Sequence, residues 1–122
     1  MIEILPPADD SAAFQVVHSD LSGNVLFAGG AGLPPAVIDI SPQFRSVPYA
    51  EAVLVADAVA WNAAPVVFAH EYVRESPGRR VDLARAVVFR VVTAVLFADT
   101  TPARVEGEAD AYRRLLPAML RA

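Results

Sequence analysis

The positions of the ten prolines constrain the fold of this 122-residue chain more than any other feature. Before Pro48, prolines and glycines interrupt each apolar run after a few residues, which is typical of short strands and turns. From Pro48 onward, most prolines stand at the ends of long stretches rich in alanine, leucine and valine, where a proline suits the first turn of a helix. The sequence therefore predicts an α+β fold in which a small β region precedes about four helices.

The positions of the prolines and glycines also predict the individual elements. We expect three short strands at residues 13–17, 24–28 and 36–40, with a hairpin turn at 29–32 and a loop over 41–47. We expect helices at 48–63, 65–75 and 79–98, and a last amphipathic helix opened by Asp99-Thr100-Thr101-Pro102. Pro117 should kink or end that last helix before Leu120. Its predicted inner face consists of Val105, Ala109, Tyr112, Leu115, Leu116 and Met119.

The segment 79–98 admits a second interpretation. Its valines have high β propensity and the run is apolar nearly all round, but its length favours a buried helix. Residues 1–12 contain two prolines and two aspartates, and we expect a flexible leader there or an added edge strand. We expect the rest, 13–122, to form one domain, with strands and loops over 13–47 and helices over 48–122.

The charge balance excludes several classes of partner. All ten basic residues are arginines, and fourteen acidic residues give a formal net charge of −4. This argues against nucleic-acid binding, which requires clustered positive charge. Arg90 interrupts the longest apolar run, which is also too short to span a bilayer, and the N-terminus does not resemble a secretory signal. We therefore expect a cytoplasmic protein with neither nucleic acid nor membrane as partner.

Chemistry-bearing side chains gather in the segment VHSDLSGNVLF, residues 17–27, and in VIDI, residues 37–40. Phosphoryl transfer needs a carboxylate near the acceptor hydroxyl and oxygen ligands for magnesium. Asp20, Asn24 and Asp39 supply these groups. Asn24 opens one predicted strand and Asp39 lies near the end of its hairpin neighbour, so both can approach the loop that bears Asp20. His18 can point its ring into this loop as a hydrogen-bonding group.

These two segments resemble the catalytic region of the aminoglycoside phosphotransferase and choline kinase superfamily, whose fold is protein-kinase-like. The usual pattern is H-G-D-L-x-x-x-N-V-L-F followed by I-D-F or I-D-W, and the chain is closest to an actinobacterial branch with a loop one residue shorter. The resemblance implies that Asp20 is the catalytic aspartate, that His18 is the loop histidine, and that Asn24 and Asp39 hold Mg²⁺. Ser19 departs from the pattern, which has glycine there.

The resemblance also implies what this chain lacks. Related enzymes grip ATP with a glycine-bearing loop and a strand lysine in an N-terminal lobe, whereas this chain has no lysine and too few residues before His18 for such a lobe. We therefore expect a C-lobe fragment with negligible activity on its own. Its expected partners are a small-molecule hydroxyl acceptor and either a complementing N-lobe chain or, in a non-catalytic module, a second copy of itself. The apolar content of 55% against the usual ~45–50% favours such a covered surface.

The candidate site residues also have structural interpretations that involve no catalysis. Asp20 and Asp39 can be turn and strand-end carboxylates that bind backbone amides, and Asn24 can be an ordinary turn residue. The glycine-rich segment 29–32 is a hairpin turn rather than a phosphate loop, because no helix or lysine follows it. Four further residues are expected to have no chemical role, namely Glu51, Asp57, Trp61 and His70. Arg79, Arg80 and Arg85 are expected on a solvated face.

Overall fold

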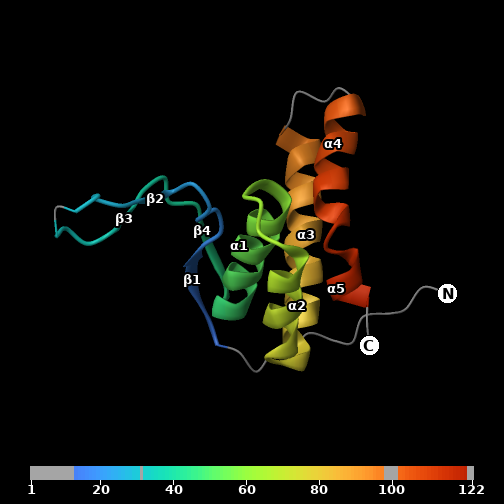
Figure 1. Ribbon diagram of the computed structural model, residues 1–122, viewed down its shortest axis with the longest axis horizontal. Coiled ribbons are helices and arrows are strands. Elements are labelled where there is room, and N and C mark those ends of the chain that lie inside the picture. The colour runs from blue at the N-terminus through green and yellow to red at the C-terminus, as the bar shows by residue number, and fades with distance from the viewer. Residues whose placement is uncertain (1–12, 31, 98–101, 121–122) are drawn as a thin grey trace.

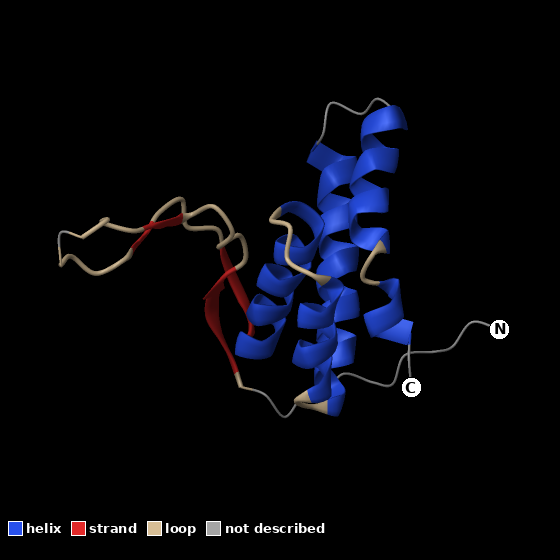
Figure 2. Ribbon diagram, in the orientation of Figure 1, coloured by secondary structure: helices blue, strands red, loops and turns tan. Residues whose placement is uncertain are grey.

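The structure of the protein is a computed structural model, and it describes residues 13–30, 32–97 and 102–120. Its α+β class is confirmed: strands lie at one side of a stack of helices (Figure 2). Each β-sheet consists of two antiparallel strands. β1 (Phe14–His18) pairs with β4 (Pro42–Ser46), and β2 (Val25–Leu26) pairs with β3 (Ala36–Val37). The predicted leader 1–12 and the predicted cap residues 99–101 lie outside the described residues.

β4 corrects the prediction of a loop over 41–47. Val16 lies opposite Phe44 and His18 opposite Pro42 in the β1–β4 ladder. A strand that begins with proline is tolerated because each strand of this sheet has one unpaired edge. The hairpin β2–β3 is confirmed, although both strands are shorter than predicted, and it extends away from the helices (Figure 1). Its turn at Gly29 and Gly30 is also confirmed, and Gly30 has the positive φ of 78° that favours glycine.

The helices match the predicted order. They are α1 (Val47–Trp61), α2 (Val66–Arg74), α3 (Pro77–Phe97), α4 (Pro102–Arg113) and α5 (Leu116–Leu120). Segment 79–98 is therefore helical up to Phe97, not a strand. The last predicted helix is divided in two after Arg113, with Pro117 in the first turn of α5. Ser46 caps α1, because its hydroxyl oxygen accepts a hydrogen bond from the Tyr49 N–H.

The hydrophobic core lies between α1, α2, α3 and the C-terminal helices. α1 packs mainly against α3, and Leu83 and Leu115 are among the largest completely buried side chains. The predicted inner face of the last helix is confirmed for Tyr112, Leu115 and Met119, whereas Leu116 is exposed. α3 is not buried all round. Its exposed apolar residues are Val88, Val92, Val95 and Leu96.

Arg79 does not belong to a solvated face. Its guanidinium lies 4.7 Å from the centroid of the Tyr72 ring and forms ion pairs with Glu51 and Glu75. The Tyr72 hydroxyl donates to the Pro48 carbonyl at 2.6 Å, which ties α2 to the start of α1. Among the described residues, no helix is both long enough and apolar enough to cross a membrane.

The three tyrosines give the fold a specific pH response. Burial raises the pKa of Tyr49, Tyr72 and Tyr112 above the usual value of 10.0. A raised folded-state pKa favours the protonated phenol in the folded chain, so the unfolded chain releases these protons first as pH rises. The resulting stability is fully present below pH 10 and is lost above it.

We therefore expect tyrosinate absorbance to rise together with the loss of helical circular dichroism in an alkaline titration. Both signals should follow one cooperative transition above pH 10. A gradual tyrosinate titration centred near pH 10, with helical dichroism unchanged, would show that the phenols are not protected by the fold.

Candidate catalytic loop

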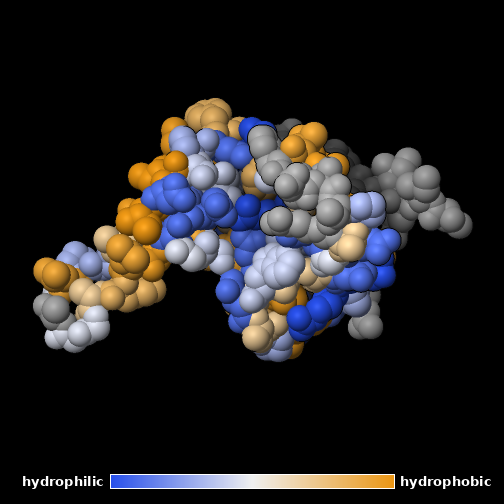
Figure 3. Space-filling view, turned by 90° about the horizontal axis from the view of Figure 1, so that it is seen from above, coloured by the Kyte–Doolittle hydropathy of each residue, from blue (hydrophilic) through white to orange (hydrophobic). Residues whose placement is uncertain are grey.

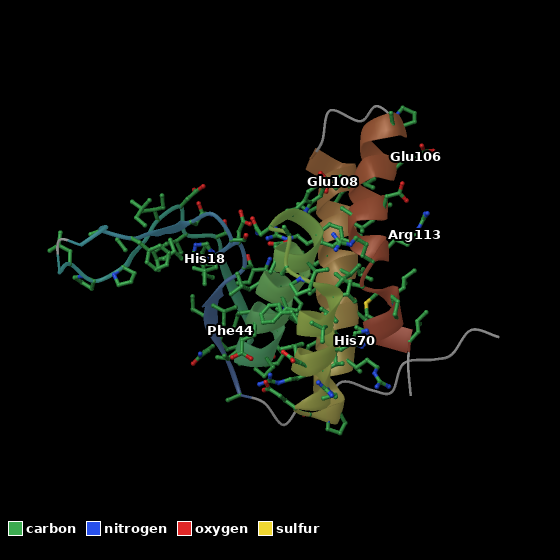
Figure 4. The ribbon with its side chains drawn as sticks, viewed as in Figure 1. His18, Phe44, His70, Glu106, Glu108 and Arg113 are labelled. Atoms are coloured by element: carbon green, nitrogen blue, oxygen red, sulfur yellow. The ribbon has the colours of Figure 1, made fainter. Side chains whose placement is uncertain are left out.

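The loop that follows β1 is fixed by hydrogen bonds from His18 and Ser19. The Asp20 N–H donates to Nδ1 of His18 at 3.0 Å, so Nε2 carries the ring proton and donates to the Ile38 carbonyl at 3.3 Å. Ser19 is buried, and both its N–H and its hydroxyl donate to the Ser41 carbonyl at 2.9 Å. His18 is thus the last residue of β1, and its ring bonds to the loop backbone as expected, where the hairpin joins the β1–β4 sheet (Figure 4).

Asn24 connects the end of this loop to its beginning. Its Nδ2 donates to the Asp20 carbonyl at 2.7 Å, and its backbone N–H donates to the Leu21 carbonyl at 3.0 Å. Gly23 makes the tight turn possible with a φ of 81°. These bonds are what a turn asparagine makes, and they also leave the Oδ1 oxygen as the group available to a cation. A magnesium-binding role for Asn24 stays a prediction.

The hairpin brings Asp39 next to this turn. The Ile38 N–H donates to the Asn24 carbonyl at 2.9 Å, which extends the β2–β3 register by one pair. In a regular strand Asp39 would point to the face opposite Asn24, because side chains alternate. Asp39 instead has a left-handed backbone with φ 49° and ends that alternation. Such a conformation in a residue other than glycine is uncommon and often marks a functional position.

Asp20 also forms an ion pair that the sequence did not predict. Nη2 of Arg90 on α3 donates to Oδ1 of Asp20 at 2.7 Å. The same guanidinium binds Asp57 on α1, with Nε 2.9 Å from Oδ1 and Nη2 close to Oδ2. The Tyr112 hydroxyl donates to Oδ1 of Asp57 at 3.0 Å and accepts from Nε1 of Trp61 at 2.9 Å. A continuous network therefore links α4, α1 and α3 to the candidate catalytic loop.

Burial and charge explain why Arg90 stays ionised. Burial alone lowers the pKa of its guanidinium, but hydrogen bonding to Asp57 and the charge of Asp57, followed by those of Asp20, more than offset this. The pKa of Arg90 consequently lies above its usual value. Burial, with a smaller contribution from the Asp57 charge, is also what raises the pKa of Tyr112.

The sequence predicts no chemical role for Asp57, and it shows Arg90 only as an interruption of an apolar run. Their place in the network becomes apparent only in the structure. One signal was available, because each residue is an isolated charge within an apolar helical segment, and isolated buried charges must find partners. Trp61 is half-exposed at the surface of α1, and it donates the hydrogen bond that fixes Tyr112.

Two adjoining cavities meet at Asp20 and Arg90. The larger, about 410 Å³, is also lined by Trp61, Asn62 and Glu108. The smaller, about 280 Å³, is also lined by Ser41, Gln43 and Phe89. The Asp20 side chain, 45% exposed, can therefore be reached from solvent while its carboxylate is bound to Arg90.

No family model, curated protein or solved structure matches this chain. The resemblance to a kinase-like superfamily therefore rests on the sequence motifs alone.

The residues present are chemically suited to magnesium but form no preassembled cage. Within the described ranges, no three histidine, cysteine, aspartate or glutamate side chains are grouped as a metal site. Mg²⁺ does not require one, since it is usually held by one or two carboxylates, substrate phosphates and water. An amide oxygen from Asn24 and a carboxylate from Asp39 fit that pattern of hard oxygen ligands.

Proposed function

We propose that this chain supplies the catalytic loop of a phosphotransferase that acts on a hydroxyl group of a small molecule. One observation carries the proposal. The Asn24 side chain is hydrogen-bonded to the Asp20 carbonyl, while its backbone pairs with Ile38, the residue before the left-handed Asp39. Three residues with the required chemistry are thus connected through direct hydrogen bonds and one peptide bond.

The proposed reaction is a direct transfer from ATP to the acceptor. The acceptor oxygen forms a bond to the γ-phosphorus, the bond from that phosphorus to the β–γ bridging oxygen breaks, and ADP leaves. The hydroxyl proton passes to the Asp20 carboxylate. Asn24 and Asp39 would hold Mg²⁺, and the bound cation would neutralise charge on the phosphate oxygens.

A low rate is part of the proposal. The family holds the nucleotide phosphates with a lysine from another lobe, and this chain contains no lysine. Positioning and electrostatics provide most of the catalysis in phosphoryl transfer, so we expect negligible turnover from these residues by themselves. The proposal places the protein in the cytoplasm, where ATP is available as donor.

Calorimetric titration with Mg-ATP tests the proposal. We expect weak, saturable heat that Asp39→Asn abolishes, because that substitution removes a charged cation ligand. Asp110→Asn, which changes an exposed carboxylate on α4, is the matched control and should leave the heat unchanged. Absence of heat from the unmodified chain would contradict the proposal, and measurable turnover abolished by Asp20→Asn would contradict the expected inactivity.

An exposed apolar surface supports a second candidate function, self-association through the β region. Val16 is 72% exposed and Phe44 is 61% exposed, although they face each other across the β1–β4 ladder. The Phe14 and Phe44 rings pack edge to face with centroids 5.9 Å apart. A cavity of about 760 Å³ continues from Phe14 to Val88 and Val92 on α3. Figure 3 shows hydrophobic surface along the side where the hairpin leaves the helices.

Light scattering across a concentration series distinguishes this alternative. If a second copy covers the β region, the mass should approach that of a dimer, and Phe44→Ser should restore the monomer. Leu120→Ser changes a similarly exposed apolar residue on α5 and serves as the control. A monomer at all concentrations would exclude self-association as the function.

A further inference from the structure

Arg90 holds two carboxylates that are distant in sequence. Its Nε and Nη2 atoms bind the two oxygens of Asp57, a paired arrangement in which the planar guanidinium matches the carboxylate. The same Nη2 has a second proton, and it donates this proton to Oδ1 of Asp20 at 2.7 Å. The guanidinium is therefore bound on one side to a helix and on the other side to the candidate catalytic loop.

The Asp57 side of this arrangement is rigid. The Asp57 side chain is only 6% exposed and that of Arg90 is 14% exposed. Charges buried to this extent are stable only when they are paired and fully hydrogen-bonded. The Tyr112 hydroxyl provides the additional bond to Asp57 and is itself held by Trp61. Asp57 therefore holds the Arg90 guanidinium in one orientation, and water does not replace this contact.

The Asp20 side is more open. Its side chain is 45% exposed, and within the described part of the chain no other hydrogen bond to its carboxylate is found. Asp57 already balances the positive charge of Arg90. The group of one arginine and two aspartates therefore keeps one net negative charge, and the contact with Arg90 orients the Asp20 carboxylate without neutralising it. One carboxylate oxygen, Oδ1, is occupied by Arg90, and the Asp20 residue lines both cavities, which leaves Oδ2 as the oxygen available to a ligand.

We infer that Arg90, anchored by Asp57, is the positioning residue for the Asp20 carboxylate. It occupies Oδ1 of Asp20 and thereby presents Oδ2 to the hydroxyl group that loses its proton. The role in phosphoryl transfer rests on the proposed function, whereas the coupling of Asp57 to Asp20 through Arg90 does not. Arginine suits this role better than lysine because its fork can bind two carboxylates at fixed angles.

Nuclear magnetic resonance of the unmodified full chain provides the first test. With labelled arginine nitrogen and aspartate carboxyl carbon, couplings across the hydrogen bonds should link the Arg90 guanidinium to both Asp57 and Asp20. The Asp20 side chain should occupy a single χ1 rotamer. Coupling to Asp57 alone, with Asp20 averaged among rotamers, would overturn the inference without any substitution.

Substitutions provide a readout that a purely structural role of Arg90 would not produce. Asp57→Asn should shift the carboxyl signal of Asp20, although no direct hydrogen bond joins the two side chains. In an Arg90→Met chain, adding Asp57→Asn should cause no further shift, because the connecting group is gone. Asp110→Asn is the control and should leave the Asp20 signal unchanged. An Asp20 signal insensitive to Asp57→Asn would overturn the inference.

Arg90→Lys covers the case in which those variants fail to fold. It keeps one positive charge but loses the second arm, so Asp20 should begin to average among rotamers while the helical dichroism is kept. Retention of a single Asp20 rotamer in this variant would also contradict the inference. Failure of the proposed function would appear separately, as an absence of Mg-ATP heat in a chain whose Arg90 couplings are intact.

Discussion

Replacing Arg90 with methionine is expected to lower the free energy of unfolding by about 3–5 kcal/mol, because the change leaves the buried Asp57 carboxylate without its counter-charge. Methionine has a similar length and good helix propensity, so loss of packing should contribute little. Asp57 would keep only the hydrogen bond from Tyr112. Urea unfolding followed by helical dichroism measures the effect.

Two further variants separate charge from general damage to α3. Arg85→Met removes an exposed arginine from the same helix and should change stability by less than ~0.5 kcal/mol. Arg90→Met combined with Asp57→Asn removes both charges while keeping an acceptor for Tyr112, and it should recover most of the loss. A double variant less stable than Arg90→Met alone would show that the buried charge is not the cause.

Leu83→Ala should cost about 2–5 kcal/mol of stability, because a completely buried leucine loses its transfer free energy and leaves a cavity. Leu83 is 0% exposed at the contact of α3 with the core. The matched control is Leu96→Ala on the same helix, where the leucine is 69% exposed and the cost should be below ~0.5 kcal/mol. Equal losses for the two variants, measured in urea, would contradict the packing described for α3.

The helices were predictable because their signals are local. Prolines suited to first turns and long runs of good helix formers identify α1 and α2 within two residues at each end. β4 was missed for a local reason as well. It begins with Pro42 and alternates polar residues with a single large apolar one, Phe44, so its pairing is apparent only once β1 lies beside it.

The candidate site is likewise predictable where its residues are close in sequence and not predictable where they are distant. Asp20 and Asn24 lie in one short loop directly after His18, and the hairpin that brings Asp39 close is recognisable from its glycines. Arg90 lies 70 positions from Asp20 and 33 from Asp57. Their contact depends on how α1 and α3 pack. A single sequence indicates only that such isolated charges need partners, not which partners they find.

Paramagnetic broadening by Mn²⁺ tests most directly whether the loop and the hairpin form one cation site. Mn²⁺ prefers the same oxygen ligands as Mg²⁺. The account predicts that amide signals at Asp20, Asn24 and Asp39 broaden together at the lowest Mn²⁺ concentrations, and that excess Mg²⁺ reverses the effect. Broadening confined to other carboxylates, such as Glu106 and Glu108 on α4 (Figure 4), would contradict a cation site at the catalytic loop.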